Sequence, residues 1–202
     1  MIIGICGFIG SGKDTAANYL VGWHGFRRDS FAGALKDAVA YVFGWDRELL
    51  EGSTAESRVW RETVDPWWSA RLDIPQLTPR WVLQQWGTEV CRKGFHDDIW
   101  IAALENRLRT RTGHTVISDV RFPNEVKAIK EQGGRIIWVQ RGDLPEWYDV
   151  ALETTTGKFN HMIQAYPEVH PSEWSWIGTK FDAIISNTGS VDALYEKLKN
   201  LV

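Results

Sequence analysis

The clearest chemical pattern in the chain is a glycine-rich stretch near its N-terminus. Gly7, Gly12 and Lys13 follow the G-x-x-x-x-G-K spacing of a phosphate-binding loop, between an apolar run and a stretch that we expect to be helical. Glycines let successive backbone N–H groups turn inward toward phosphate oxygens, and the lysine adds a positive charge beside them. We therefore predict that residues 7–15 bind the phosphates of a ligand.

The residue after the lysine departs from the usual motif. Ser or Thr normally binds magnesium at that place, but this chain has Asp14, followed by Thr15. Asp14 could arrange water around Mg²⁺, accept a proton from the attacking phosphate, or only interact with the positive end of the helix dipole. The sequence leaves open whether Asp14 or Thr15 reaches the metal.

A second group of charged residues follows the apolar run 114–118. Asp119 is placed to hold Mg²⁺ directly or through water, or else to cap the helix that we expect from Pro123. Arg121 could bind a phosphate with two hydrogen bonds, or pair with Asp119 or Glu125. If the strand continues this far, Asp119 and Arg121 point to the same side. The residues expected to be catalytic are Lys13, Asp14, Asp119 and Arg121, and those expected to reach the metal are Asp14, Thr15 and Asp119.

Polar side chains on an otherwise apolar helix form a third candidate site. Thr78 and the proline after it predict the helix start, and Gly94 predicts its end. Gln85 and Glu89 share one face and are suited to reading the edge of a base, and Arg80 is suited to a phosphate; alternatively, this is only a solvated face. The expected apolar stripe is Val82, Leu83, Trp86 and Val90.

Strands alternate with helices along the chain, which predicts an α/β fold around a five-stranded parallel sheet flanked by helices. The expected strands are 2–6, 114–118, 135–140 and 181–186, and 26–31 is expected to be a short strand or an extended segment. In such sheets ligands bind beyond the carboxyl ends of the strands. The glycine-rich loop, 31–33, 119–121 and Arg141 all follow such ends, so we expect them to meet in one crevice.

We expect residues 1–202 to form a single domain. Two segments of it do not follow the alternation of strands and helices. Residues 45–79 interleave charged residues with tryptophans and prolines, which predicts a helical insertion near the substrate site. Residues 141–180 have weak periodicity with several glycines and prolines. A structureless stretch of that length is uncommon in a compact domain, so we expect a lid-like segment there.

Composition excludes several classes of protein. The 202 residues carry a net charge of -3 without a long basic run, which argues against a protein whose main function is to bind duplex nucleic acid. Cys6 and Cys91 are far apart, which favours a reducing cytoplasm over a disulfide framework, and no Cys/His spacing supports zinc. We find no signal peptide and no run long enough to span a membrane. Most of the twelve tryptophans should serve packing.

In five blocks the chain resembles the phage-type deoxynucleoside monophosphate kinases, a branch of the P-loop nucleoside monophosphate kinases. The resemblance accounts for Asp14, because the Gly-Lys-Asp-Thr ending of the loop is typical of this branch. Some relatives carry basic residues inside the loop, where this chain has Ile9 and Gly10. The five blocks are 7–15, 31–38, 78–100, 117–125, and 170–173 with the final strand and helix.

The resemblance implies transfer of the γ-phosphoryl of ATP, with Mg²⁺, to a deoxynucleoside 5′-monophosphate for DNA precursor synthesis. It implies host cytoplasm as the location if a phage encodes the chain, and a possible homodimer. The implied ATP-binding residues are Gly7, Gly10, Ser11, Gly12, Lys13, Asp14, Thr15 and Arg141, although another basic residue of 141–180 could take the place of Arg141. The implied substrate-binding residues are Phe31, Lys36, Arg58, Arg61, Arg80, Gln85, Thr88, Glu89, Trp100 and Arg121, with the choice between Arg58 and Arg61 open.

Two other functions fit part of the pattern. A dephospho-coenzyme A kinase or another small-acceptor P-loop kinase shares the loop but does not need the block from Gln85 to Glu89. A nucleotide-binding module without catalysis would use ATP only to change the shape of the tryptophan-rich segments. Lys13, Asp119 and Arg121 together argue against it. The accepted base does not follow from the sequence.

Overall fold

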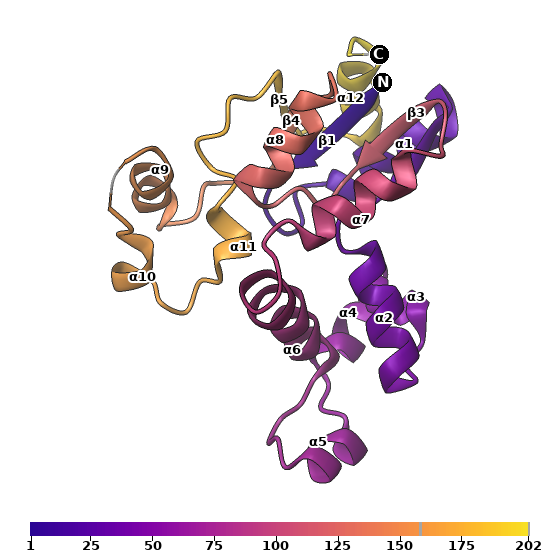
Figure 1. Ribbon diagram of the computed structural model, residues 1–202. Coiled ribbons are helices and arrows are strands. Elements are labelled where there is room, and N and C mark those ends of the chain that lie inside the picture. Colours follow the sequence, from indigo (N-terminus) through magenta and orange to yellow (C-terminus); the bar gives the residue numbers. More distant parts are fainter. Residues whose placement is uncertain (158, 202) are drawn as a thin grey trace. The chain divides into compact units, whose positions relative to one another are not determined.

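The computed structural model describes residues 1–157 and 159–201, which form two compact units (Figure 1). The first unit comprises Met1–Ser30 and the chain from Arg111 onward. The second unit comprises Phe31–Thr110. No helix in the described part of the chain is long and apolar enough to cross a membrane.

A five-stranded sheet forms the centre of the first unit, and every strand pair in it is parallel. The strands lie in the order β2-β3-β1-β4-β5, with Gly4 of β1 opposite Ile117 of β3 and Ile136 of β4. The predicted parallel sheet is therefore confirmed. The strands are β1 (Ile2–Cys6), β2 (Phe26–Asp29), β3 (His114–Ile117), β4 (Arg135–Gln140) and β5 (Ala183–Ser186).

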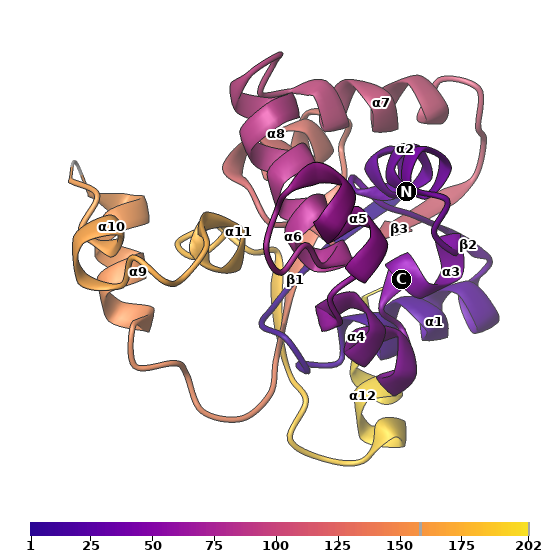
Figure 2. The ribbon, with the colours of Figure 1, turned by 90° about the horizontal axis from the view of Figure 1, so that it is seen from below.

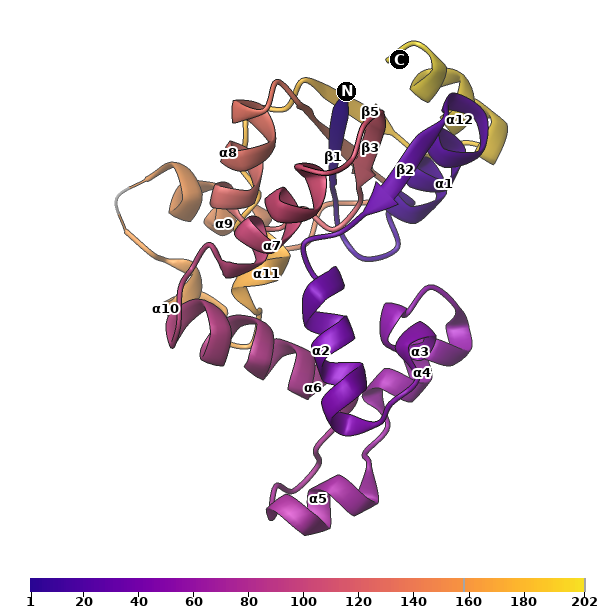
Figure 3. The ribbon, with the colours of Figure 1, turned by 45° about the vertical axis from the view of Figure 1, so that its right-hand side comes forward.

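Helices cover both faces of this sheet (Figure 3). Alternate residues of a strand point to opposite faces, so Ile3 and Ile5 share one face, where they join a buried cluster with α1 and α12. Gly4 faces the other side, where a Cβ atom would lie 2.7 Å from Cδ1 of Ile129 on α8. The helices of this unit are α1 (Lys13–His24), α8 (Pro123–Glu131), α9 (Tyr148–Thr156), α10 (Met162–Ala165), α11 (Pro171–Trp174) and α12 (Val191–Lys199).

The second unit is helical (Figure 2). It has its own apolar core. Leu35, Val39, Leu50 and Val82 are buried there, with several tryptophans packed against them. Short helices occur between residues 45 and 79, as predicted. Each begins at an N-cap residue whose side chain accepts hydrogen bonds from backbone N–H groups, as Asp65 does for α5. The helices are α2 (Gly33–Phe43), α3 (Arg47–Glu51), α4 (Ala55–Glu62), α5 (Pro66–Leu72), α6 (Pro79–Gln84), η1 (Gln85–Lys93) and α7 (Ile99–Leu108).

The helix predicted after Thr78 changes its winding halfway. Thr78 caps α6 as expected, but the continuation η1 is a π-helix. A π-helix closes i→i+5 bonds and has a wider turn, so a stripe drawn at α-helical spacing does not stay on one face. The prediction of Val90 as part of the apolar stripe is wrong for this reason: its side chain is 56% exposed.

In the segment 141–180, the described residues form three short helices, α9, α10 and α11. The segment packs through aromatic side chains: the ring of Phe8 contacts Trp147 and Trp176, with centroids 5.6 and 5.0 Å apart. Met162 is also fully buried. The segment therefore carries secondary structure and apolar anchors that its weak periodicity did not indicate.

Candidate functional site

The glycine-rich loop joins β1 to α1. Gly7 and Gly12 have φ angles of 150° and 97°, in the region that favours glycine. A Cβ atom at Gly7 would lie 2.5 Å from the carbonyl oxygen of Val139, and one at Gly12 would collide with the amide of Asn187. The Asn187 Nδ2 group donates to the Ser11 carbonyl at 2.9 Å. The loop backbone therefore packs closely against β4 and is held by Asn187, which follows β5.

Lys13 folds back over this loop. Its Nζ atom donates to the carbonyl oxygens of Gly7 and Phe8 at 2.7 and 2.8 Å. Burial, together with the charge of Arg121, lowers the pKa of Lys13 to about 8, although Asp14 and Glu173 act in the opposite direction. The amine thus sits in a partly desolvated position where a phosphate would interact with it strongly.

Two further features of the loop fit a phosphate. The Oγ atom of Ser11 is buried and has no hydrogen-bond partner among the described residues. Gly12, at the N-cap of α1, has no side chain to satisfy the first N–H groups of the helix. Unsatisfied donors at a helix N-terminus form an anion site.

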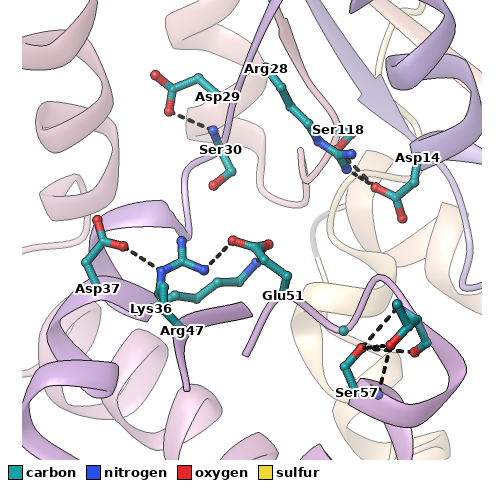
Figure 4. A network of polar contacts seen from close by, with 12 residues as sticks. Asp14, Arg28, Asp29, Ser30, Lys36, Asp37, Arg47, Glu51, Ser57 and Ser118 are labelled. Carbon is teal, nitrogen blue, oxygen red and sulfur yellow. Dashed lines mark hydrogen bonds and ion pairs between the residues drawn. The ribbon is translucent and has the colours of Figure 1, made fainter. Parts of the chain in front are cut away.

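Asp14 and Arg28 form an ion pair beside the loop (Figure 4). Ser118 takes part as well: its Oγ atom accepts from Arg28 at 2.7 Å and donates to Asp14 at 3.3 Å. The carboxylate of Asp14 is therefore already engaged by two groups. Thr15 is half-buried on the next position of the helix.

Residues 119–121 lie beyond the end of β3, so no strand supports the expectation that Asp119 and Arg121 point to one side. The guanidinium of Arg121 donates to Glu173 Oε1 at 3.0 Å and to the Ser172 carbonyl at 3.2 Å. Its backbone amide donates to Glu125 Oε2 at 2.8 Å. Arg121 is therefore held by α11 and by the start of α8, while Asp119 is half-buried between β3 and α8.

Lys36 of the second unit belongs to a network of four charged side chains (Figure 4). Its Nζ atom is 2.5 Å from Glu51, which also pairs with Arg47; Arg47 reaches Asp37 at 2.5 Å. Although burial acts in the opposite direction, Lys36 and Arg47 hold the pKa of Glu51 below its usual value. Lys36 is mostly covered, and Phe31 is buried.

The candidate arginines of this unit differ in their surroundings. Arg58 is exposed and donates to the carbonyl oxygens of Gly52 and Ser53 at 3.2 and 3.1 Å. Arg61 is half-buried, with its guanidinium so close over Gly52 that a Cβ atom there would collide with it. Arg80 pairs with Glu62 at 3.3 Å.

The π-helix carries three of the predicted substrate residues. Gln85 and Thr88 are half-buried, and Glu89 pairs with Lys93 at 2.8 Å. Trp100 donates through Nε1 to the carbonyl oxygen of Gly87 at 2.8 Å, so it fixes this helix. The remaining predicted residue, Arg141, is exposed at the end of β4 and makes no hydrogen bond or ion pair with any part of the chain that the structure describes.

The residues that could hold magnesium are few. Within residues 1–157 and 159–201, no group of three or more His, Cys, Asp and Glu side chains could hold a metal ion. Mg²⁺ bound with nucleotides commonly takes only one or two protein ligands, the phosphates and water supplying the rest. The hydroxyl of Thr15 and the carboxylate of Asp119 fit that chemistry.

Sequence reasoning missed Arg28, Asn187 and Glu173. Arg28 and Asn187 lie at or just beyond the carboxyl end of a strand, the same signal that indicated Asp119. That signal could have found both. Glu173 pairs with a residue 52 positions away, and no local pattern indicates such a partner.

Comparison with known proteins assigns the family. No family model matches the chain. It is 31% identical over 215 residues to a protein of Acanthamoeba polyphaga mimivirus named "Putative deoxynucleotide monophosphate kinase", covering 100% of this chain and 96% of the relative. It is 27% identical over 180 residues to the deoxynucleoside-5′-monophosphate kinase of Escherichia phage T5, covering 65% of this chain and 72% of the relative.

Solved structures similar to the chain include shikimate kinase from Aquifex aeolicus, with 14% identity and a TM-score of 0.46 over 100% of this chain and 95% of that one. Dephospho-CoA kinase from Campylobacter jejuni has 15% identity and a TM-score of 0.43, over 99% and 94%. TM-scores below 0.5 do not establish a common fold, so the assignment rests on the sequence relatives. Because the mimivirus relative matches along nearly its whole length, the chain belongs to the deoxynucleoside monophosphate kinase family.

Proposed function

We propose that this protein transfers the γ-phosphoryl group of ATP to a deoxynucleoside 5′-monophosphate and so produces the diphosphate for DNA synthesis. The observation that carries the proposal is the loop from Gly7 to Lys13: Ser11 Oγ has no hydrogen-bond partner among the described residues, the N-cap of α1 has no side-chain cap, and Lys13 is partly desolvated. Membership of the family supplies the acceptor class.

The loop residues bind the donor. The amides of residues 10–13 and the Nζ atom of Lys13 bind the β- and γ-phosphates of ATP, and Lys13 exchanges its bonds to the loop carbonyls for bonds to phosphate. Bound Mg²⁺ would neutralise charge on these phosphates, with Thr15, Asp119 or Asp14 holding it. Placement and neutralisation of charge are the main contributions of a protein to phosphoryl transfer.

The acceptor is bound by the remaining charged and polar residues. Arg121 and Arg80 orient its phosphate, and the helix from Gln85 to Glu89 contacts the base. Lys36 and either Arg58 or Arg61 supply further positive charge. Glu173 and Glu62 now occupy Arg121 and Arg80, so binding of the phosphate replaces one anion by another at each arginine.

The two unusual segments serve these sites. Residues 45–79 form an insertion beside the acceptor, and residues 141–180 form a lid whose Arg141 closes over the transferred group. Closure excludes water and limits hydrolysis of ATP. We further propose action on small nucleotides rather than duplex nucleic acid, a homodimer as the functional form, and the host cytoplasm as the location.

The test is a panel of acceptors with γ-labelled ATP and Mg²⁺. We expect label to appear in at least one deoxynucleoside diphosphate and not in coenzyme A. Lys13→Ala should abolish transfer without unfolding the protein, whereas Lys127→Ala, which changes an exposed lysine on α8, should not alter it. Labelling of dephospho-coenzyme A alone, or ATP binding without transfer to any acceptor, would refute the proposal.

A further inference from the structure

Arg28 connects three parts of the first unit. It lies on β2, and its Nη2 atom donates to Asp14 Oδ1 in the first turn of α1 (Figure 4). Nη1 donates to Asn18 Oδ1 at 3.1 Å, one turn further along this helix. Nη2 also donates at 2.7 Å to Ser118 Oγ, just beyond β3. One guanidinium thus joins the helix after the loop, strand β2 and the residue before Asp119.

Stability does not account for this arrangement. The side chains of Arg28 and Asp14 are 38% and 61% exposed. Ion pairs exposed to this extent contribute little to the free energy of unfolding, because water screens them and ordering the side chains costs entropy. We therefore ask how the contacts of Arg28 change the effect of Asp14 on phosphate binding at the loop.

An uncompensated charge on Asp14 would oppose nucleotide binding. Asp14 directly follows Lys13 on a helix whose N-terminus offers its amides to phosphate. Its charge is felt at the Lys13 amine, where it acts to raise the pKa. The same field would act with the opposite sign on the phosphates of ATP and repel them.

We propose that Arg28 is a positioning residue for nucleotide binding. It orients Asp14 and neutralises its charge, so that the aspartate after Lys13 does not repel the phosphates of ATP. Arg28 acts through Asp14 and does not itself touch the phosphates. The inference rests on the proposed function only in that the loop binds ATP.

The test measures ATP binding by titration calorimetry, with EDTA present so that no metal takes part. Arg28→Met leaves Asp14 uncompensated, and we expect the dissociation constant to rise about tenfold at low salt. Added salt should reduce this difference, because repulsion between exposed charges is screened. Adding Asp14→Asn to Arg28→Met removes the repelling charge and should return the constant to within about threefold of the wild-type value.

Arg27→Met is the matched control. Arg27 neighbours Arg28 on β2 and is exposed, and its side chain forms no hydrogen bond or ion pair with the described residues. This variant should bind ATP like the wild type, and thermal unfolding should occur at the same temperature for both arginine variants.

Two results would overturn the proposal. One is an unchanged dissociation constant in Arg28→Met; the other is a double variant that binds as weakly as Arg28→Met, since Arg28 would then contact the nucleotide or shape the loop itself. The wild type is assayed separately for transfer to deoxynucleotides. A wild type that binds ATP but transfers nothing refutes the proposed reaction, and the binding series still decides the role of Arg28.

Discussion

At the scale of single residues, the protonation of Lys13 couples nucleotide binding to pH. The pKa of this lysine is lowered to about 8, first by burial and then by Arg121. Below pH 8 the amine is charged and attracts phosphate; as the pH rises through 8 it loses its proton and the attraction. We therefore expect affinity for ATP to fall about tenfold between pH 7 and pH 9.

Calorimetric titration of ATP across this pH range checks the expectation. Lys13→Met, which cannot titrate, should bind more weakly at every pH and show no step near pH 8. Lys127→Met, on an exposed face of α8, should keep the wild-type profile. A step that persists in Lys13→Met would mean that another group is responsible.

Asn187 is the residue whose loss should damage the loop most selectively. Its buried amide donates to the Ser11 carbonyl from beyond β5. Asn187→Ala removes this bond and leaves a buried acceptor, so the free energy of unfolding should fall by about 1–3 kcal/mol. Urea denaturation measures that loss, and ATP binding should weaken with it. Asn106→Ala, at an exposed position of α7, should change neither quantity.

At the scale of elements, the strands and most helices followed from local pattern, whereas long-range contacts did not. The run Arg135–Gln140 reads as a strand and is one, and Gly44 ends α2 in a left-handed conformation as a glycine there predicts. No local sequence pattern predicted the π-helix. Its contacts include one with a residue outside the helix, Trp100. The site follows the same division: the loop was predicted, but the pairing of Arg121 with Glu173 was not.

The π-helix gives a prediction at this scale. Trp100 holds it through a hydrogen bond to the Gly87 carbonyl, and Trp100→Phe keeps an aromatic side chain, although a smaller one, but removes the donor. If this helix contacts the acceptor, KM for the deoxynucleotide should rise about three- to tenfold, the loss expected for one hydrogen bond. The dissociation constant of ATP should stay unchanged.

Steady-state kinetics with each substrate varied in turn separates these two effects. Trp81→Phe is the control, since Trp81 lies on α6 with its side chain partly in solvent. Equal changes in the affinity for both nucleotides would show that Trp100 only maintains the fold of its unit.

At the scale of the whole molecule, the residues proposed to bind ATP lie in the first unit, and most of those proposed to bind the acceptor lie in the second; each unit buries its own apolar core. The donor loop belongs to the first unit, and the π-helix belongs to the second. Because a bound ligand protects the amides that it contacts or stabilises, the two nucleotides should leave different traces in hydrogen exchange. ATP in EDTA should slow exchange in the loop and α1, and the deoxynucleotide alone should slow exchange in η1. If both nucleotides slowed hydrogen exchange in the first unit alone, the π-helix would not belong to the acceptor site. Arg121, in the first unit, would then be the acceptor residue that remains.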